Sequence, residues 1–444
     1  MPILRDDCRA NRVTDDDRTI ELAGVVLRGH LISQATFDYA TENAPTIADL
    51  RRTVGHLARG PLNRILRRSP VPGARSSWLP GPPTVTLHLR EEPLEPSSTV
   101  AWLQEQREHA GGDRGLVSVS RAHRTDGRTL VTVQYPHTAA DGGAMYAALL
   151  AASRGLSGAR TPDERARAPR ITDDLVDSGR QFRRLIRTVR EREAPRTPVP
   201  AVERPAPGGA PAGDGPTPLV VALSTTGTAW KAAAKARSAS GNTLLVAFMT
   251  DLLLSTERYA GIDAVPTNIP IDVRAEGSRD ANNTASVTVA VTRDAIEGDL
   301  AGLHATIKAA LVASGNRPGT QRRSTPLEVA AHFIPDALVD RLAGPHPLSM
   351  LTCSNMGAVD PDFPSLFGPA ADRILMVAAP TPVTPERLAR GGGGLAAWLD
   401  IVGDTLTLSV VCLDPLVFAD AADAQRHLAA TAERFGIAPE FWNI

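Results

Sequence analysis

The sequence predicts an α+β protein made of two lobes joined by a linker, and three observations support this. Residues 1–193 mix short apolar strand-like runs with helical ones, without a regular β-α-β alternation. Residues 194–218 are so rich in Pro, Gly and Ala that they cannot bury a core, which is typical of a linker. From 219 to 444 the mixed pattern resumes. With 444 residues, 42% of them hydrophobic, the chain can fill two cores.

In the first lobe, period-two and apolar runs predict strands, and runs of helical periodicity predict helices. The expected strands cover 23–29, 84–89 and 129–133, and the expected helices cover 46–59, 98–110, 144–152 and 173–192. The second lobe reads in the same way. Its expected strands are 219–223, 285–292, 348–353, 396–402 and 405–413, and its expected helices are 229–239, 243–259, 297–313, 335–342 and 421–435.

Composition excludes several classes of function. A net charge of −1 gives no electrostatic reason to bind nucleic acid. No run of eighteen apolar residues occurs, and charges stand where a signal peptide would be hydrophobic, so we expect no transmembrane segment and a cytoplasmic location. Three widely spaced cysteines suit reduced thiols better than a disulfide framework or a zinc site. Cys353 and Cys412 lie in apolar runs and are expected in the core.

One short segment carries the strongest chemical pattern. The apolar run 130–133 leads to His137, Asp141 and Gly142 on a turn, and the helix expected at 144–152 follows. An imidazole fixed where a strand passes into a helix can act as a general base, because its ordinary pKa lies near neutrality. The alternative is a hydrogen-bonded loop brace without chemistry.

Three further patterns accompany this HxxxDG segment. Asn268–Arg274 contains PxDxR, the pair Asn282-Asn283 follows, and Ser354–Gly357 reads SNxG. With these residues the chain resembles the chloramphenicol acetyltransferase-like superfamily. It is most similar to condensation domains of nonribosomal peptide synthetases, mycobacterial polyketide-associated acyltransferases and the wax ester synthase/diacylglycerol acyltransferase group. The resemblance extends to Ser240–Leu245, which opens an apolar helix, and to the glycine run at 391–394 before a strand pair.

The resemblance implies two similar α/β lobes arranged as a V, with a central tunnel that meets His137. It implies that His137 is the general base and that Asp141 points away from the tunnel and pairs with Arg274. Many relatives carry two consecutive histidines, and Pro136 replaces the first here. This departure bears on the shape of the tunnel more than on activity. The residues expected along the tunnel are Tyr135, Pro136, Ser354 and Asn355.

Several roles stay open at this level. Gly142 and Gly143 either shape the turn or offer N–H groups to an oxyanion at a helix N-terminus. Ser354 and Asn355 either supply a second donor, line the acceptor channel or cap a turn. Asp272 competes for nearby basic groups, and we expect it to be solvated or to cap a loop.

An arginine-rich helix at 181–190 also has more than one interpretation. It reads first as a solvated surface helix. The alternatives are an arginine patch that docks an acidic carrier protein or grips the phosphates of coenzyme A, and an interfacial membrane helix, although its apolar face is narrow and lacks Trp.

The expected function is acyl transfer from an acyl-CoA or carrier-protein thioester to a hydroxyl or amine of a small-molecule acceptor. We expect no bound cofactor and no metal; the thioester of coenzyme A or phosphopantetheine is a co-substrate. The expected state is a monomer that works with an acyl or peptidyl carrier protein if the donor is carrier-bound. The alternatives are a free-standing condensation-type enzyme and a catalytically silent relative that only binds carrier proteins.

Overall fold

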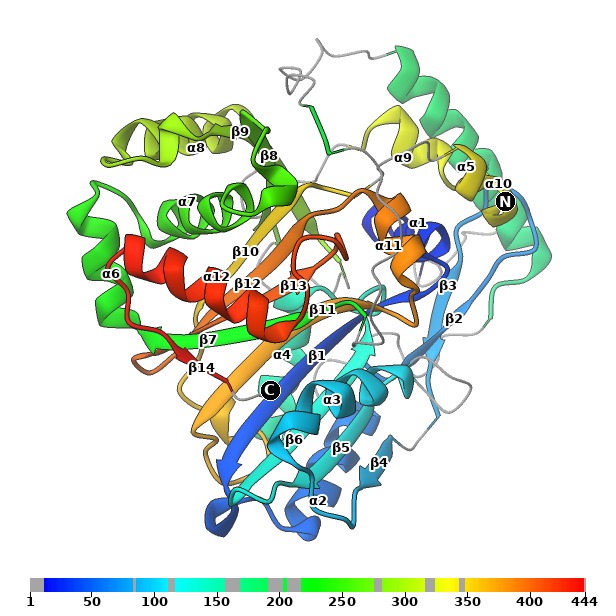
Figure 1. Ribbon diagram of the computed structural model, residues 1–444. Coiled ribbons are helices and arrows are strands. Elements are labelled where there is room, and N and C mark those ends of the chain that lie inside the picture. The colour runs from blue at the N-terminus through cyan, green and yellow to red at the C-terminus, as the bar shows by residue number, and fades with distance from the viewer. Residues whose placement is uncertain are drawn as a thin grey trace.

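The computed structural model has two large β-sheets that pack against each other and carry helices on their outer faces, and a small sheet of two strands (Figure 1). It describes residues 12–82, 85–110, 116–155, 168–190, 203–205, 217–274, 282–315, 324–342 and 348–442. This mixed α/β architecture confirms the predicted fold class. No helix within those ranges is long and apolar enough to cross a membrane.

The first sheet has five strands in the order β11-β1-β6-β5-β4. All neighbouring pairs are antiparallel except β4 with β5. Helices α2, α3 and α4 belong to this lobe, and α2 and α4 pack together. The bounds are β1 His30–Ala40, β4 Thr86–Leu89, β5 Ser118–His123, β6 Arg128–Pro136, β11 Arg373–Thr381, α2 Ile47–Arg59, α3 Thr99–Glu108 and α4 Gly142–Ser153.

The second sheet has seven strands in the order β14-β7-β13-β12-β10-β8-β9. Helices α6, α7, α8 and α12 lie on its outer side (Figure 1). The bounds are β7 Val220–Thr226, β8 Ala264–Asp272, β9 Thr284–Thr292, β10 Leu351–Ala358, β12 Leu395–Val402, β13 Thr405–Cys412, β14 Glu440–Phe441, α6 Gly227–Ala236, α7 Gly241–Leu254, α8 Ala301–Ala313 and α12 Ala421–Arg434.

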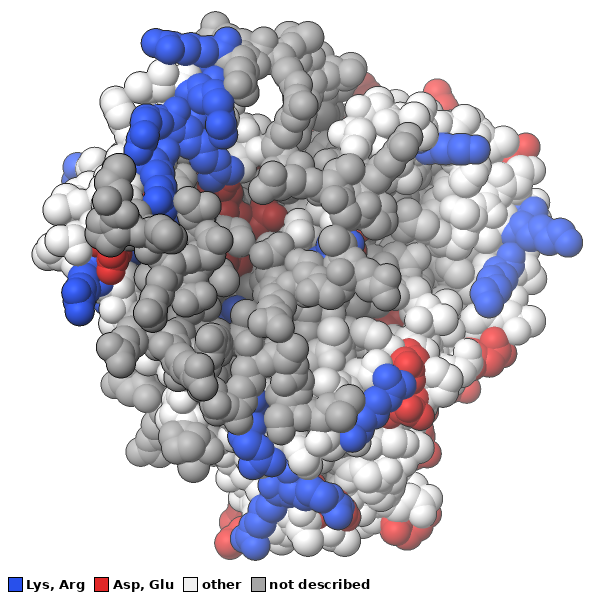
Figure 2. All heavy atoms as spheres, turned by 180° about the vertical axis from the view of Figure 1, so that it is seen from behind, with Lys and Arg blue, Asp and Glu red and all other residues white. Residues whose placement is uncertain are grey.

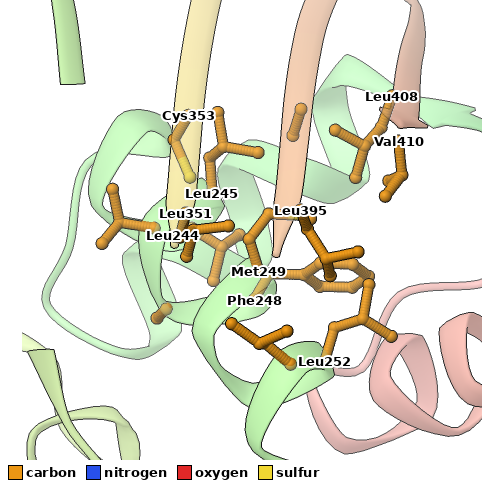
Figure 3. Packing of buried hydrophobic residues seen from close by; sticks show 14 of the residues in the cluster. Leu244, Leu245, Phe248, Met249, Leu252, Leu351, Cys353, Leu395, Leu408 and Val410 are labelled. Carbon is orange, nitrogen blue, oxygen red and sulfur yellow. The ribbon is translucent and has the colours of Figure 1, made fainter. Parts of the chain in front are cut away.

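Helix α7 is the centre of the second core. Ser240 caps its N-terminus by accepting a hydrogen bond from Thr243 N, and eleven of its fourteen residues are buried. A helix that is apolar all round is stable only where other elements cover it, and β10, β12 and β13 do so here (Figure 3). Cys353 and Cys412 are buried in this core, as predicted.

Strand β11 crosses between the lobes. It comes from the second half of the chain but pairs along its whole length with β1 of the first sheet. Its residues Val377 and Ala379 pack against Val220 and Val411 of the second sheet. The division of the chain at 194–218 remains a prediction, because most of that segment lies outside the described residues. Strand β11 follows this segment in the sequence but belongs to the first sheet.

The second sheet opens between β10 and β8. These parallel strands pair only at Leu351 with Thr267 and at Thr352 with Asn268. Beyond that point β10 continues beside β12, and β8 continues beside β9. The N-terminus of α4 from the first lobe touches both diverging strands, since side chains of β10 and of the segment after β8 surround Gly142 and Gly143.

The strand predicted at 23–29 is wrong, because most of these residues form the end of helix α1, Asp15–Leu27. Thr14 and Asp17 form a reciprocal capping box that fixes the start of this helix. The remaining elements are β2 Arg64–Arg67, β3 Ser77–Pro80, α5 Ile171–Arg190, α9 Pro326–Ala330, α10 Asp336–Leu342, α11 Pro385–Gly391 and short 3-10 helices at Thr41–Asn43, Pro96–Ser98, Glu257–Tyr259, Asp294–Ile296 and Phe363–Ser365.

Candidate active site

His137 is the first residue after the central strand β6. Its backbone N–H donates to Leu31 O at 2.7 Å, so the sheet pairing with β1 fixes the point where the chain turns. Residues 137–139 form a turn, and α4 begins at Gly142. The residue is half-buried, and the Nδ1 atom of its imidazole is buried. The sequence therefore placed this histidine correctly between a strand and a helix.

The surroundings of His137 favour its neutral form. Burial lowers the pKa of the imidazole below its ordinary value, and this effect outweighs the charge of Asp141, the residue's own backbone and the side chain of Asn282, all of which favour the protonated form. A neutral imidazole can accept a proton at neutral pH. This is the protonation state that a general base needs.

Asp141 is the N-cap of α4 and does not reach toward the histidine ring as a relay. Its Oδ1 accepts from Ala144 N at 3.0 Å. Its Oδ2 accepts from Asn283 N at 3.0 Å and from the Thr284 hydroxyl at 2.8 Å. Both carboxylate oxygens are thus occupied by donors that hold the loop between the lobes.

Arg274, just after β8, completes the ring of donors around Asp141. Its Nη2 lies 2.5 Å from Asp141 Oδ2, and its Nη1 lies 3.2 Å from Asp272 Oδ1. Burial alone would raise the pKa of Asp141, but the bond and charge of Arg274 and the backbone N–H donors hold that pKa below its usual value. Asp141 is therefore a buried, permanently charged anchor.

Asp272 behaves differently from Asp141 although both bind the same arginine. Its side chain is 55% exposed, whereas that of Asp141 is 7% exposed. Asp272 Oδ1 also accepts from Arg274 N at 2.9 Å, so it caps the end of the strand. This is the solvated, loop-capping arrangement that the sequence favoured.

The His137 turn is braced from behind by a pair that the sequence did not reveal. Asn282 Nδ2 donates to Thr138 O at 2.9 Å and to Asp17 Oδ1 at 2.7 Å. Asp17, on α1, is buried, and Trp78 Nε1 donates to its other oxygen at 3.2 Å. Asn282 stood in the quoted Asn-Asn pair, but nothing in the sequence pointed to Asp17, 265 positions away.

A buried arginine adds a second brace. Arg64 donates to Ala139 O, and its guanidinium lies over the Trp78 ring at 4.3 Å from the ring centre. Burial lowers the pKa of Arg64 to about 10, opposed by the charge of Asp17. The cation remains charged at neutral pH, and it faces Asp17 across the indole.

The two glycines at the start of α4 are required by close contacts. A Cβ at Gly142 would lie 2.9 Å from Met356 Sδ, on β10. A Cβ at Gly143 would lie 2.7 Å from Asp272 Oδ2 and 2.9 Å from Arg274 Nη1. Packing between the lobes therefore accounts for both glycines. The oxyanion role suggested for their N–H groups stays a prediction.

The remaining predicted site residues are Tyr135, Pro136, Ser354 and Asn355. Asn355 is exposed, and its Oδ1 accepts from Gly357 N at 2.8 Å, which caps a bulge in β10. Ser354 is half-buried on the same strand. Tyr135 and Pro136 are buried, and the Tyr135 ring belongs to the first lobe's core. The tunnel-lining roles of these four residues remain predictions.

A hollow of about 380 Å³ lies at the opposite end of α4 from His137. It is formed by α2, the C-terminal end of α4 and the turn at Ser365–Gly368, and includes Arg52, His56 and Arg154. Arg154 is already paired with Asp360 and Asp362. Twelve helical residues, about 18 Å, separate this hollow from the imidazole, so it does not belong to the His137 site.

Among the described residues, no group of three or more His, Cys, Asp or Glu side chains could hold a metal ion. What the residues offer is a neutral imidazole, one buried carboxylate neutralised by an arginine and an amide brace.

Comparison with solved structures reveals similar folds. The first condensation domain of the CDA synthetase aligns over 97% of this chain and 99% of its own length, with a TM-score of 0.54 and 17% identity. The wax ester synthase/diacylglycerol acyltransferase from Marinobacter aquaeolei VT8 aligns over 96% of this chain and 100% of its own, with a TM-score of 0.54 and 15% identity. The condensation domain of the Monacolin K polyketide synthase MokA gives a TM-score of 0.52 at 11% identity, over 96% and 97% of the two chains.

No protein-family profile matches the sequence, and no curated protein sequence matches it. The structural likeness nevertheless covers nearly the whole chain in three proteins. It confirms the resemblance drawn from the motifs at the level of the fold: the chain folds as these condensation domains and the wax ester synthase do.

Proposed function

We propose that this protein is an acyltransferase that moves an acyl group from a thioester to a hydroxyl or amine, with His137 as general base. The observation that carries the proposal is the position of His137 in the turn between β6 and α4, which Asp141 and Arg274 tie to the opposite sheet. Burial lowers the pKa of this imidazole, which suits a general base. Solved structures with this fold are described as condensation domains and as a wax ester synthase, which supports the same class of reaction.

The reaction balances with one base. The acceptor O–H or N–H gives its proton to the His137 imidazole as its oxygen or nitrogen attacks the thioester carbonyl carbon. The carbon–sulfur bond then breaks, and the leaving thiolate takes the proton back from the imidazolium. Such a base contributes about 10² to 10⁴ in rate, and the rest comes from holding the two substrates together.

The donor thioester is carried either by coenzyme A or by the phosphopantetheine arm of a carrier protein. A condensation-type reaction that joins carrier-bound partners is the second candidate, because the chain matches the full length of a condensation domain. A silent carrier-binding relative is less well supported, since the HxxxDG residues are all present. The acceptor would be a small molecule, and we propose a monomer.

The test is product formation by mass spectrometry. Purified protein is supplied with a panel of acyl-CoAs and carrier-bound acyl groups, each with candidate alcohols and amines. We expect His137→Ala to fold normally and to lose about 10²-fold or more of the rate found for the best pair.

His427→Ala on α12 is the matched control, because His427 is half-exposed on a helix that packs against α7 and β7. It should leave the rate unchanged. Turnover by His137→Ala equal to that of the control would remove the general-base assignment. Product only from carrier-bound donors would favour the condensation-type reaction.

A further inference from the structure

Helix α5 is attached to the protein by its polar face. Its buried residues are Asp174, Asp177 and Gln181. Asp174 is completely buried and pairs with Arg12 Nη1 at 2.7 Å, and Asp177 pairs with Arg75 Nη2 at 2.9 Å. This reverses the usual arrangement, in which an amphipathic helix buries its apolar stripe and exposes its charges.

The apolar residues of α5 consequently face outward. Of the twelve large apolar side chains exposed in the described part of the chain, six lie on this one helix. Ile171 is 60% exposed, Leu175 58%, Phe182 54% and Val189 47%. At about 100° per residue these four and Ile186 fall within about 60° of arc, so they form a straight stripe. The six residues are Ile171, Leu175, Val176, Phe182, Ile186 and Val189.

Arginines border one side of this stripe. Arg183, Arg187 and Arg190 are exposed, whereas two of the three acidic residues, Asp174 and Asp177, are turned into the protein. The third, Asp173, is half-buried and accepts from Arg170 N at 2.9 Å. The helix forms an outer edge of the molecule (Figure 1), and basic side chains gather along that edge (Figure 2). Its twenty residues extend about 30 Å. The neighbouring helix α9 adds Leu327, which is 75% exposed.

We propose that α5 is an interfacial helix that binds the surface of an anionic lipid bilayer. A convex apolar ridge is bordered by arginines, and the half-buried Asp173 lies on the far side of the helix from the stripe. Such a ridge fits a flat surface that is apolar beneath and negatively charged above. The helix lies on the bilayer and does not span it, because charged residues recur on every turn.

The experiment is flotation of the full chain with two kinds of vesicle, phosphatidylcholine alone and phosphatidylcholine containing phosphatidylglycerol. We expect binding to the anionic vesicles only. Leu175→Ser with Val189→Ser should weaken that binding by at least about tenfold, because two well-exposed apolar anchors are lost. Arg187→Gln with Arg190→Gln should weaken it by about fivefold for each arginine.

Two matched controls lie elsewhere on the surface. Val312→Ser on α8 removes a side chain that is 71% exposed, and Arg426→Gln on α12 removes an arginine that is 70% exposed. Neither should change binding. If the melting curve of the Leu175→Ser, Val189→Ser variant shows that it does not fold, the Arg187→Gln, Arg190→Gln variant decides the outcome.

Absence of binding, or equal binding to both kinds of vesicle, would overturn the proposal. So would a dimer in light scattering that the Leu175→Ser, Val189→Ser variant dissociates, because the stripe would then be an interface between two copies. The proposal is independent of acyl transfer, since vesicle binding needs no substrate and His137→Ala should bind vesicles normally.

Discussion

Arg274 Nη2 donates to Asp141 Oδ2 at 2.5 Å, which ties the end of β8 in the second sheet to the N-cap of α4 in the first lobe. The carboxylate that the HxxxDG pattern places beside the histidine therefore joins the two lobes. The same oxygen accepts from Asn283 N and the Thr284 hydroxyl at the start of β9. The position of the His137 turn and the charge of Asp141 thus depend on residues of the opposite lobe.

The first prediction compares the two carboxylates that Arg274 binds. Asp141→Asn should lower the free energy of unfolding by about 3–5 kcal/mol, because the Arg274 guanidinium loses its buried charge partner and keeps only the exposed Asp272. Asp272→Asn, on the exposed side of the same arginine, should cost less than about 1 kcal/mol. Urea unfolding of the two variants measures the difference, and equal losses would contradict a buried ion pair.

The second prediction concerns the glycines at the start of α4. Gly143→Ala should destabilise the protein by about 1–3 kcal/mol, because its methyl group meets the carboxylate of Asp272 and the guanidinium of Arg274. Gly142→Ala should cost less, since the atoms it meets are the flexible end of Met356. Met356→Ala should restore Gly142→Ala but not Gly143→Ala in thermal melts, and restoration of both would refute this account.

The third prediction is the pH dependence of turnover. Only the neutral imidazole accepts a proton, so the rate should fall as pH drops through the pKa of His137. Because burial lowers this pKa, the midpoint of the acid limb should lie below the ordinary histidine value of 6.5. Asn282→Leu removes a side chain that holds the pKa up, so the limb should move to still lower pH.

The same variant should reduce kcat by roughly tenfold or more with little change in KM, because the His137 turn loses its brace at Thr138 O. Thr284→Val is the control. It removes a hydrogen bond from Asp141 without changing charge near the imidazole, so it should lower stability and leave the acid limb in place. A limb that moves equally in both variants would show that Asn282 acts only through stability.

Residues with a fixed local spacing could be predicted from the sequence. His137, Asp141 and Gly142 lie within six positions, and the strand before them and the helix after them are both clear in the pattern. Arg274 was paired with Asp141 through the family resemblance. Asp17, Arg64 and Trp78 could not be found, because the tertiary fold alone brings these separated positions to the His137 turn.

The missed elements have physical reasons too. Strand β1 has eight consecutive buried residues, so it shows no alternation, and several of them are polar. Gln34 donates to Leu103 O, and Asp38 pairs with Arg128 and Arg373, so their burial is compensated by partners far along the chain. Residues 23–29 were predicted as a strand because of Val25 and Val26. The capping box at Thr14 starts a helix that continues through most of them.

The glycine run at 391–394 connects α11 to β12. Gly392 caps α11 with a φ of 61°, in the left-handed region. A Cβ at Gly394 would lie 2.3 Å from Met350 O. This segment is closely packed.

The opening between β8 and β10 has a thermal consequence. Beyond Asn268, strand β8 pairs with β9 and no longer with β10. The same end of the β8-β9 hairpin carries Arg274, Asn282 and Thr284. Segments with fewer hydrogen-bonded neighbours open before the cores do. On warming, this end of the hairpin should fray first and release the His137 turn, so the enzyme would inactivate reversibly at a temperature below that at which its two cores melt.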